Sequence, residues 1–195
     1  MKIAQMAVGS YQTNTYILCQ EDSERCLIID PGYEPERIMR YVNQKGLNVE
    51  AILLTHGHFD HVGAVRQIAA DTDCDVYINQ KETAMPPMFT AGPLYFTQTY
   101  DEGDRLNLAG MEFTVLAPPG HTPGSVCLDF GEDLFTGDTL FAGSCGRTDL
   151  PGGNSAQMLQ SLQRLAALEK DCRVYPGHSG SSTLEWERRT NPYMR

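Results

Sequence analysis

The chain has 195 residues, of which 41% are hydrophobic and 21% are charged, and its formal net charge is −10. This length and composition are typical of one globular domain with a sizeable core, so we predict a single domain over residues 1–195. The strong negative charge works against contact with a phosphate backbone, which argues against a nucleic-acid partner.

Short apolar runs of strand character alternate with helical patterns along the chain. In chain order we predict strands at 16–19 and 26–29, a helix at 35–45, a strand at 51–54, a helix at 62–70, strands at 76–79, 112–116, 126–130 and 134–136, a helix at 155–168, a strand at 173–175 and a helix at 184–189. Pro35 and Gly46 mark the ends of the first helix, and Asn154 or Ser155 can cap the third. This pattern predicts an α/β sandwich whose loops gather at one edge.

Two segments have further expectations. The apolar residues of the helix at 155–168 repeat at helical spacing and should face a sheet; they are Met158, Leu159, Leu162, Leu165 and Ala166. The proline-rich segment 83–99 fits either a loop collapsed onto the core or a flap that forms a wall for a substrate.

Six cysteines occur without a Cys-x-x-Cys pair, and most of them adjoin apolar runs. We interpret them as reduced, structural residues, which favours a cytoplasmic location. Cys145 is the exception, because it adjoins a glycine-rich segment. The N-terminal residues show no apolar run long enough for a signal peptide or a membrane span, so no membrane partner is expected. The sequence does not indicate an oligomeric state.

All five histidines fall in three short segments. Three of them lie in His-x-His-x-Asp-His at residues 56–61, directly after a predicted buried strand, and His121 and His178 each follow another apolar run. In an extended loop, alternate side chains point the same way, so His56, His58 and Asp60 should share one side, with His61 turned to a neighbouring point. Histidine and carboxylate ligands in this number suit two adjacent metal ions.

Each of these residues also has a structural alternative. Asp60 could cap the helix that follows, Asp138 could be a turn residue, and His121 and His178 could be ordinary loop histidines. The ordered combination of all the motifs favours a metal site over these separate explanations.

The motifs THGHFDHVGA, GHTPGS, FTGDTLF and YPGH resemble the metallo-β-lactamase superfamily, and most closely its compact glyoxalase II-like (hydroxyacylglutathione hydrolase-like) members. The resemblance implies an αββα sandwich with a binuclear centre of two divalent ions, zinc being expected and iron or manganese being alternatives. It places His56, His58 and His121 on one ion, Asp60, His61 and His178 on the other, and Asp138 between them. Common class B β-lactamases place a cysteine on the second metal and lack this aspartate, so Asp138 argues against antibiotic hydrolysis.

The implied reaction is hydrolysis of an acyl thioester, a small molecule such as S-D-lactoylglutathione, by a metal-bridging hydroxide, with Asp60 and Asp138 as catalytic residues. A thiolate leaving group needs little protonation, whereas the amine leaving group of an amide would need a proton donor. Few residues follow His178, so we do not expect the helical C-terminal domain with which full-length glyoxalase II enzymes contact glutathione.

Two residues are assigned outside the ligand set. Asp30 could orient a ligand histidine by accepting its distal N–H, or could simply form an Asp-Pro-Gly turn. Arg147 could pair with a substrate carboxylate, or could anchor its own loop through Asp149.

Two other functions compete with thioester hydrolysis. Residues 145–149 read Cys-Gly-Arg-Thr-Asp, as in persulfide dioxygenases, which use a single iron and act on glutathione persulfide. A metal-dependent sensor or scaffold is the non-enzymatic alternative, although a binding module has no need of an open, water-activating centre.

Overall fold

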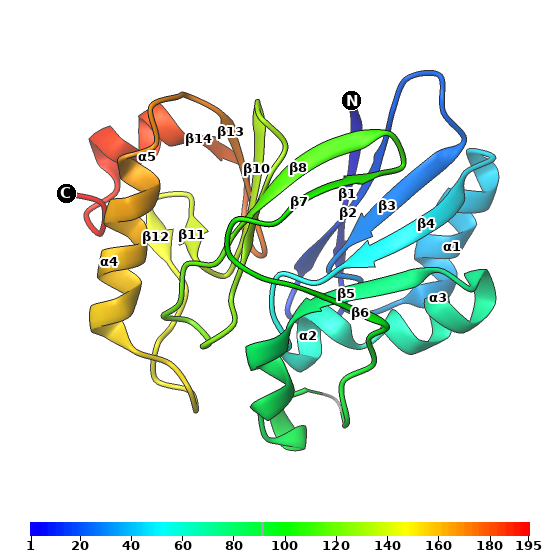
Figure 1. The fold of residues 1–195 in the computed structure, drawn as a ribbon, viewed down its shortest axis with the longest axis horizontal. Helices are drawn as coiled ribbons and strands as arrows, with labels where there is room; N and C mark the ends of the chain where they lie inside the picture. Colours follow the sequence, from blue (N-terminus) through cyan, green and yellow to red (C-terminus); the bar gives the residue numbers. More distant parts are fainter. Residues whose placement is uncertain (91) are drawn as a thin grey trace.

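The computed structural model describes residues 1–90 and 92–195. Two six-stranded sheets pack against each other, and helices cover both outer faces (Figure 1). The predicted αββα sandwich is therefore confirmed.

The first sheet, blue to green in Figure 1, has the strand order β1-β2-β3-β4-β5-β6. Its strands are Lys2–Val8 (β1), Thr13–Cys19 (β2), Arg25–Ile29 (β3), Asn48–Leu53 (β4), Asp75–Asn79 (β5) and Gln98–Tyr100 (β6). Strands β1, β2 and β3 are antiparallel, whereas β3, β4, β5 and β6 run parallel to one another.

The second sheet has the order β14-β13-β10-β9-β8-β7. Its strands are Arg105–Leu108 (β7), Met111–Leu116 (β8), Cys127–Asp129 (β9), Asp133–Gly137 (β10), Arg173–Pro176 (β13) and Ser182–Thr183 (β14). Strands β10 and β13 are parallel, and the other pairs are antiparallel. A small ribbon, Leu140–Phe141 (β11) with Ser144–Cys145 (β12), follows β10.

The helices are Pro35–Gln44 (α1), Phe59–Val62 (α2), Val65–Thr72 (α3), Ser155–Ala166 (α4) and Leu184–Thr190 (α5), with 3-10 turns at Gln80–Ala84 (η1) and Pro87–Phe89 (η2). The helix predicted at 62–70 is divided into α2 and α3. The cause is a contact from outside the helix: the N–H of Ala64 donates to the carbonyl of Pro31 at 3.0 Å, which interrupts the helical ladder.

Strand β2 shows how the layers are built. Ile17 and Cys19 point to the apolar layer beneath α1 and α3, whereas Tyr16 and Leu18 point to the layer between the two sheets. This alternation follows from the two-residue period of a strand, and it makes β2 hydrophobic on both faces. A third apolar layer lies between the second sheet and helices α4 and α5.

Helix α4 begins as predicted but presents a narrower apolar stripe. Asn154 caps it by accepting the N–H of Gln157 at 3.1 Å. Met158, Leu162 and Leu165 are buried, as predicted, but Leu159 is 45% exposed, so its assignment to the sheet-facing side is wrong. Ser161 is buried in this face and donates to the carbonyl of Pro119 at 2.6 Å.

In the part of the chain that the structure describes, no helix combines the length and the apolar character that a membrane crossing requires.

Candidate metal centre

The polar motifs of the sequence meet at one edge of the sandwich because of strand direction. The parallel strands β3 and β4 end just before Asp30 and the segment 55–61, and the parallel strands β10 and β13 end just before Asp138 and the segment containing His178. The carboxyl ends of parallel strands lie at the same edge of a sheet. Residues far apart in the sequence therefore converge, as the prediction of loops at one edge requires.

His56, His58 and His121 form a buried group in which one ring nitrogen of each lies within 4.8 Å of the others. His58 Nδ1 is 2.8 Å from His121 Nε2, which is 3.3 Å from His56 Nε2. Protonated rings at this spacing would repel one another, whereas neutral rings direct their lone pairs toward a common point. The arrangement suits a cation held by three nitrogen atoms.

Asp60, His61 and His178 form the second group. His178 Nε2 lies 3.3 Å from Asp60 Oδ2 and 3.4 Å from His61 Nε2. The prediction that Asp60 shares a side with His56 and His58 is wrong. The extended run ends at His58, with ψ of 145°, and the helical turn of α2 begins at Phe59 and carries Asp60 to the second group. Asp60 lies inside this turn rather than capping a helix at Val62.

Asp138 lies between the two groups. Its Oδ1 is 3.4 Å from His61 Nε2, and its Oδ2 is 3.5 Å from His121 Nε2 and 3.6 Å from His178 Nε2. Oδ1 is buried and has no hydrogen-bond partner among the described residues. An unsatisfied buried oxygen costs about 1–3 kcal/mol, and a carboxylate costs more, unless a cation meets it. The nitrogen and oxygen donors here therefore fit divalent metal ions such as zinc or iron.

Asp30 binds the far side of His61. Its Oδ2 accepts from His61 Nδ1 at 2.9 Å and from the Thr55 hydroxyl at 2.6 Å, and its Oδ1 accepts from the Thr55 N–H at 2.8 Å. Asp30 is buried and has a left-handed backbone conformation with a φ of 48°. The structure thus shows the histidine contact that the sequence offered for this residue. With Nδ1 donating, the Nε2 lone pair of His61 faces the centre.

Backbone carbonyls orient two further histidines in the same manner. The carbonyl of Arg147 accepts from His121 Nδ1 at 2.7 Å, and the carbonyl of Tyr11 accepts from His178 Nδ1 at 3.2 Å. Both bonds leave Nε2 directed at the centre, as a ligand nitrogen requires.

Burial and charge give the two groups different proton affinities. Burial opposes the charging of His61, but Asp138 and Asp30 outweigh it and raise the pKa of His61 well above its usual value. Burial, reinforced by His121, lowers the pKa of His58 to about 4. Burial also opposes ionisation of Asp138, yet His61 holds the pKa of this carboxyl below its usual value. The rings around His58 therefore favour the neutral form, whereas the carboxylates around His61 favour a positive charge at that position, which a bound cation would also supply.

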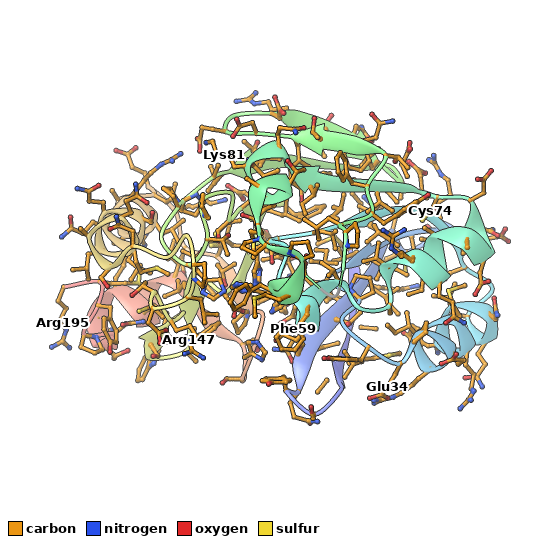
Figure 2. The ribbon with its side chains drawn as sticks, turned by 90° about the horizontal axis from the view of Figure 1, so that it is seen from below. Glu34, Phe59, Cys74, Lys81, Arg147 and Arg195 are labelled. Carbon is orange, nitrogen blue, oxygen red and sulfur yellow. The ribbon has the colours of Figure 1, made fainter. Side chains whose placement is uncertain are left out.

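A cavity of about 490 Å³ opens onto the centre. Its apolar walls are Tyr11, Phe59, Phe89, Phe141 and Leu150, and the Tyr11 and Phe59 rings meet edge to face with centroids 5.3 Å apart. Phe59 and Arg147, both labelled in Figure 2, also line it and come from α2 and from the loop after β12. The centre is thus reached through a cleft that has several aromatic side chains in its walls.

Arg147 pairs with its neighbour in this loop. Its Nε and Nη2 donate to the two carboxylate oxygens of Asp149 at 2.7 and 2.8 Å, which is the loop-anchoring alternative. The side chain is 61% exposed, so contact with a substrate carboxylate stays a prediction. Cys145 also lines the cavity, and all six cysteines are free thiols, as predicted.

The segment 83–99 combines both interpretations offered for it. Leu94 and Phe96 pack against the core beneath α1 and α3, whereas Phe89 lines the cavity. Residue 91 belongs to the same prediction but lies outside the described residues.

Sequence reasoning missed two polar residues beside the centre. Thr13 donates its hydroxyl to Asp60 Oδ2 at 3.1 Å, and Glu82 is buried against the loops that carry the histidines. Neither has a signal in the sequence, because Thr13 opens strand β2 outside every histidine motif and Glu82 stands in the polar run Gln-Lys-Glu-Thr.

A sandwich of this kind, with a group of three histidines beside a group of two histidines and an aspartate at one edge, defines a class of metal-dependent hydrolases. The family model of the Metallo-beta-lactamase superfamily matches residues 8–178, and the chain belongs to this superfamily. Its relatives include the probable metallo-hydrolase YqgX of Bacillus subtilis (strain 168), 38% identical over 100% of this chain and 98% of that protein. Hydroxyacylglutathione hydrolase GloC of Haemophilus influenzae is 34% identical over 100% and 98% of the two chains.

The solved structures that this chain resembles include a β-lactamase, a di-iron-bound protein and ETHE1. BLEG-1, a B3 metallo-beta-lactamase, has a TM-score of 0.91 at 33% identity over 99% of each chain. TTHA1623, solved in a di-iron-bound form, has a TM-score of 0.88 at 37% identity over 97% of this chain and 99% of its own. ETHE1 from Myxococcus xanthus has a TM-score of 0.86 at 30% identity over 98% and 84%. Together with the family match, this likeness establishes a metal-dependent hydrolase of the superfamily.

Proposed function

We propose that the protein hydrolyses acyl thioesters of the hydroxyacylglutathione type, such as S-D-lactoylglutathione, at a centre of two divalent metal ions. The observation that carries the proposal is the position of Asp138, whose carboxylate lies within 3.6 Å of histidines from both groups. Similarity to GloC over nearly the whole of both chains supports the substrate class.

The two groups would divide the ligands between the ions. His56, His58 and His121 would hold one and Asp60, His61 and His178 the other, with Asp138 available to both. Two bound divalent ions, with zinc proposed, would supply a Lewis acid for the carbonyl oxygen and an ionised water at neutral pH.

The surrounding residues support this chemistry by holding atoms in place. Asp30 and the carbonyl of Arg147 keep the protons of His61 and His121 on Nδ1, so that both Nε2 atoms face inward. Thr13 restrains Asp60 through its hydroxyl. The apolar walls suit the carbon skeleton of a thioester, and a thiolate with a pKa of about 8.5 leaves without a side-chain proton donor.

The direct test is release of free thiol from S-D-lactoylglutathione by purified, zinc-loaded protein. We expect turnover by the wild type and none above background by His58→Ala, because His58 supplies one of three nitrogen ligands in its group. A β-lactam assayed in parallel tests the likeness to BLEG-1. Absence of turnover across a panel of acyl thioesters would reject the proposal.

A second candidate is a mononuclear-iron persulfide dioxygenase that acts on glutathione persulfide. The Cys-Gly-Arg-Thr-Asp segment suggests it, because Cys145 and Arg147 of that segment line the cavity, and the chain also resembles ETHE1. One iron per chain with oxygen uptake on glutathione persulfide would favour this candidate, whereas two zinc ions per chain with thiol release would favour the hydrolase.

Arg147 provides a test of glutathione recognition. If its guanidinium leaves Asp149 to pair with a substrate carboxylate, Arg147→Leu should raise KM for a glutathione thioester roughly threefold to tenfold and leave kcat nearly unchanged, because an exposed pair contributes about 1 kcal/mol. The control substrate is an acyl thioester without a carboxylate in its thiol part, for which KM should not change. Equal KM changes for both substrates would show that Arg147 acts only on its own loop.

A further inference from the structure

Glu82 is a buried carboxylate that the proposed reaction does not use. It lies in η1, directly after β5, and the neighbouring Lys81 marks this turn in Figure 2. Asn79 caps the turn by accepting the N–H of Lys81 at 3.0 Å, which fixes where Glu82 enters the interior. The Glu82 side chain has no exposed surface. Burial of a carboxylate costs free energy unless hydrogen bonds compensate for the lost water contacts, so the partners of Glu82 are informative.

Both oxygens of Glu82 bind the loops that carry the first histidine group. Oε2 accepts from the N–H of Gly57 at 2.7 Å, and Oε1 accepts from the N–H of Gly124 at 2.8 Å. Gly57 stands between His56 and His58, and Gly124 belongs to the loop of His121. One loop follows β4 of the first sheet and the other joins β8 to β9 of the second. A single carboxylate therefore joins two loops from two different sheets.

Glycine at both contact points allows this close approach. A Cβ atom at residue 57 would lie 3.2 Å from Glu82 Oε2, and one at residue 124 would lie 2.7 Å from Oε1. The second distance is too short for any real Cβ contact, so a side chain at residue 124 would displace the carboxylate. Glycine therefore stands at both positions where the Glu82 carboxylate approaches the backbone closely.

The spacing between these loops matters because the first histidine group is shared between them. His58 Nδ1 and His121 Nε2 lie 2.8 Å apart although 63 positions separate them in the sequence. Apolar packing between the sheets is not directional and does not by itself set this spacing. Hydrogen bonds from N–H groups to a carboxylate are short and directional, so Glu82 can set it.

We propose that Glu82 is a positioning residue that sets the distance between the His56–His58 loop and the His121 loop, and thereby the metal affinity of that histidine group. The inference rests on the proposed metal centre but not on the proposed substrate. Asp30 has a comparable position beside the second histidine group, where its carboxylate accepts from the Thr55 N–H and from His61 Nδ1. Glu82 touches neither the reacting atoms nor the cavity, as far as the described lining residues show.

The test compares zinc binding by metal-free wild-type protein with that by Glu82→Gln, using competition with a chromophoric chelator. Glutamine keeps the size of the side chain but turns an amide NH₂ toward one of the two N–H donors, which breaks that bond. We expect one of the two zinc-binding steps to weaken about 10- to 100-fold and the other to change less than threefold, as for other residues that orient metal ligands. In the zinc-loaded enzyme, kcat should fall more than KM rises.

Glu50→Gln is the matched control. Glu50 Oε1 accepts from the N–H of Ala109 at 2.7 Å and its Oε2 accepts from Arg25 at 2.9 Å, so this carboxylate also joins separate segments, but it contacts no histidine loop. We expect Glu50→Gln to bind zinc as the wild type does. Circular dichroism and thermal unfolding of each metal-free variant establish that it is folded.

Gly124→Ala disturbs the hydrogen bond between the Gly124 N–H and Glu82 Oε1 without changing Glu82 itself. If Glu82→Gln does not fold, zinc binding by Gly124→Ala tests the proposal instead. Selective weakening of one zinc step in either folded variant supports the proposal. Unchanged affinity in both steps, or equal weakening of both, overturns it. Wild-type protein that binds two zinc ions but hydrolyses no thioester would contradict the proposed function alone and leave this comparison valid.

Discussion

Replacement of Asp138 by asparagine is expected to lower the rate of thioester hydrolysis by about 10²–10³-fold, the range typical for removal of one electrostatic stabilising group. Asparagine preserves the shape of the side chain but removes its negative charge. Asp138 is the residue whose oxygens lie 3.4–3.6 Å from histidines of both groups, so its charge would be shared by both ions. We therefore expect zinc content to fall from two ions per chain toward one. Elemental analysis and steady-state kinetics on the same preparation measure both effects.

Asp171→Asn is the control for this prediction. Asp171 accepts backbone N–H groups of Cys172 and Glu185 at 2.9 and 2.8 Å, and it precedes β13 at the end opposite to His178. Its replacement removes the same charge from the chain without touching the centre, so activity should stay near that of the wild type. An Asp138→Asn variant that keeps two zinc ions and most of its activity would show that the bridging role is wrong.

Substitution of Gly177 by alanine is expected to damage the centre through a steric clash. The added Cβ would lie 2.2 Å from Asp138 Oδ1 and 2.7 Å from His61 Cε1. The backbone cannot retreat easily, because the Gly177 N–H donates to Gly137 at 2.8 Å and its carbonyl accepts from Asn14 at 2.7 Å. We expect kcat/KM to fall about 10- to 100-fold, as when a metal ligand is displaced, with a loss of about 1–3 kcal/mol in the free energy of unfolding.

Gly180→Ala provides a control with the same chemical change close by in the chain. A Cβ atom at residue 180 would meet no atom within 4 Å. Its effect on the free energy of unfolding should stay within about 0.5 kcal/mol, and kcat/KM should be unchanged. Chemical denaturation and kinetics on both variants separate the clash at Gly177 from the general effect of replacing glycine. Equal behaviour of the two variants would contradict the steric account.

The predicted strands were those with continuous apolar runs, and each lies within or overlaps a strand of the structure. Strands β1, β6, β7 and β14 were missed for a common reason. Each lies at the edge of its sheet, where half-exposed residues such as those of Arg105–Leu108 lack a continuous apolar run. The two-residue strands β11 and β12 were also missed. Edge strands depend on pairing with a neighbour, which residue composition does not reveal.

The break between α2 and α3 was also not predicted from the sequence, because a single hydrogen bond from outside the helix causes it. Residues 62–70 have a helical pattern, yet the carbonyl of Pro31 takes the N–H of Ala64 and the ladder is interrupted. Leu159 fits the helical period of α4 but faces outward, because the buried face is narrower than the apolar pattern. In both cases tertiary contacts override local propensity.

The sequence by itself determined the superfamily and the layered fold through the resemblance of its motifs, and it named the histidines and aspartates that the structure brings to one edge. Only the tertiary structure decided that Arg147 pairs with Asp149 and that aromatic side chains wall the cavity. It also decided between two expectations for Asp60, because it groups this residue with His61 and His178, as the resemblance implies, and not with His56 and His58, as strand alternation implies. It alone revealed Glu82 between the two histidine loops. Apart from the Arg147–Asp149 pair, these contacts join residues that are distant along the chain. They depend on how the two sheets bring their loops together, and no local pattern encodes that arrangement.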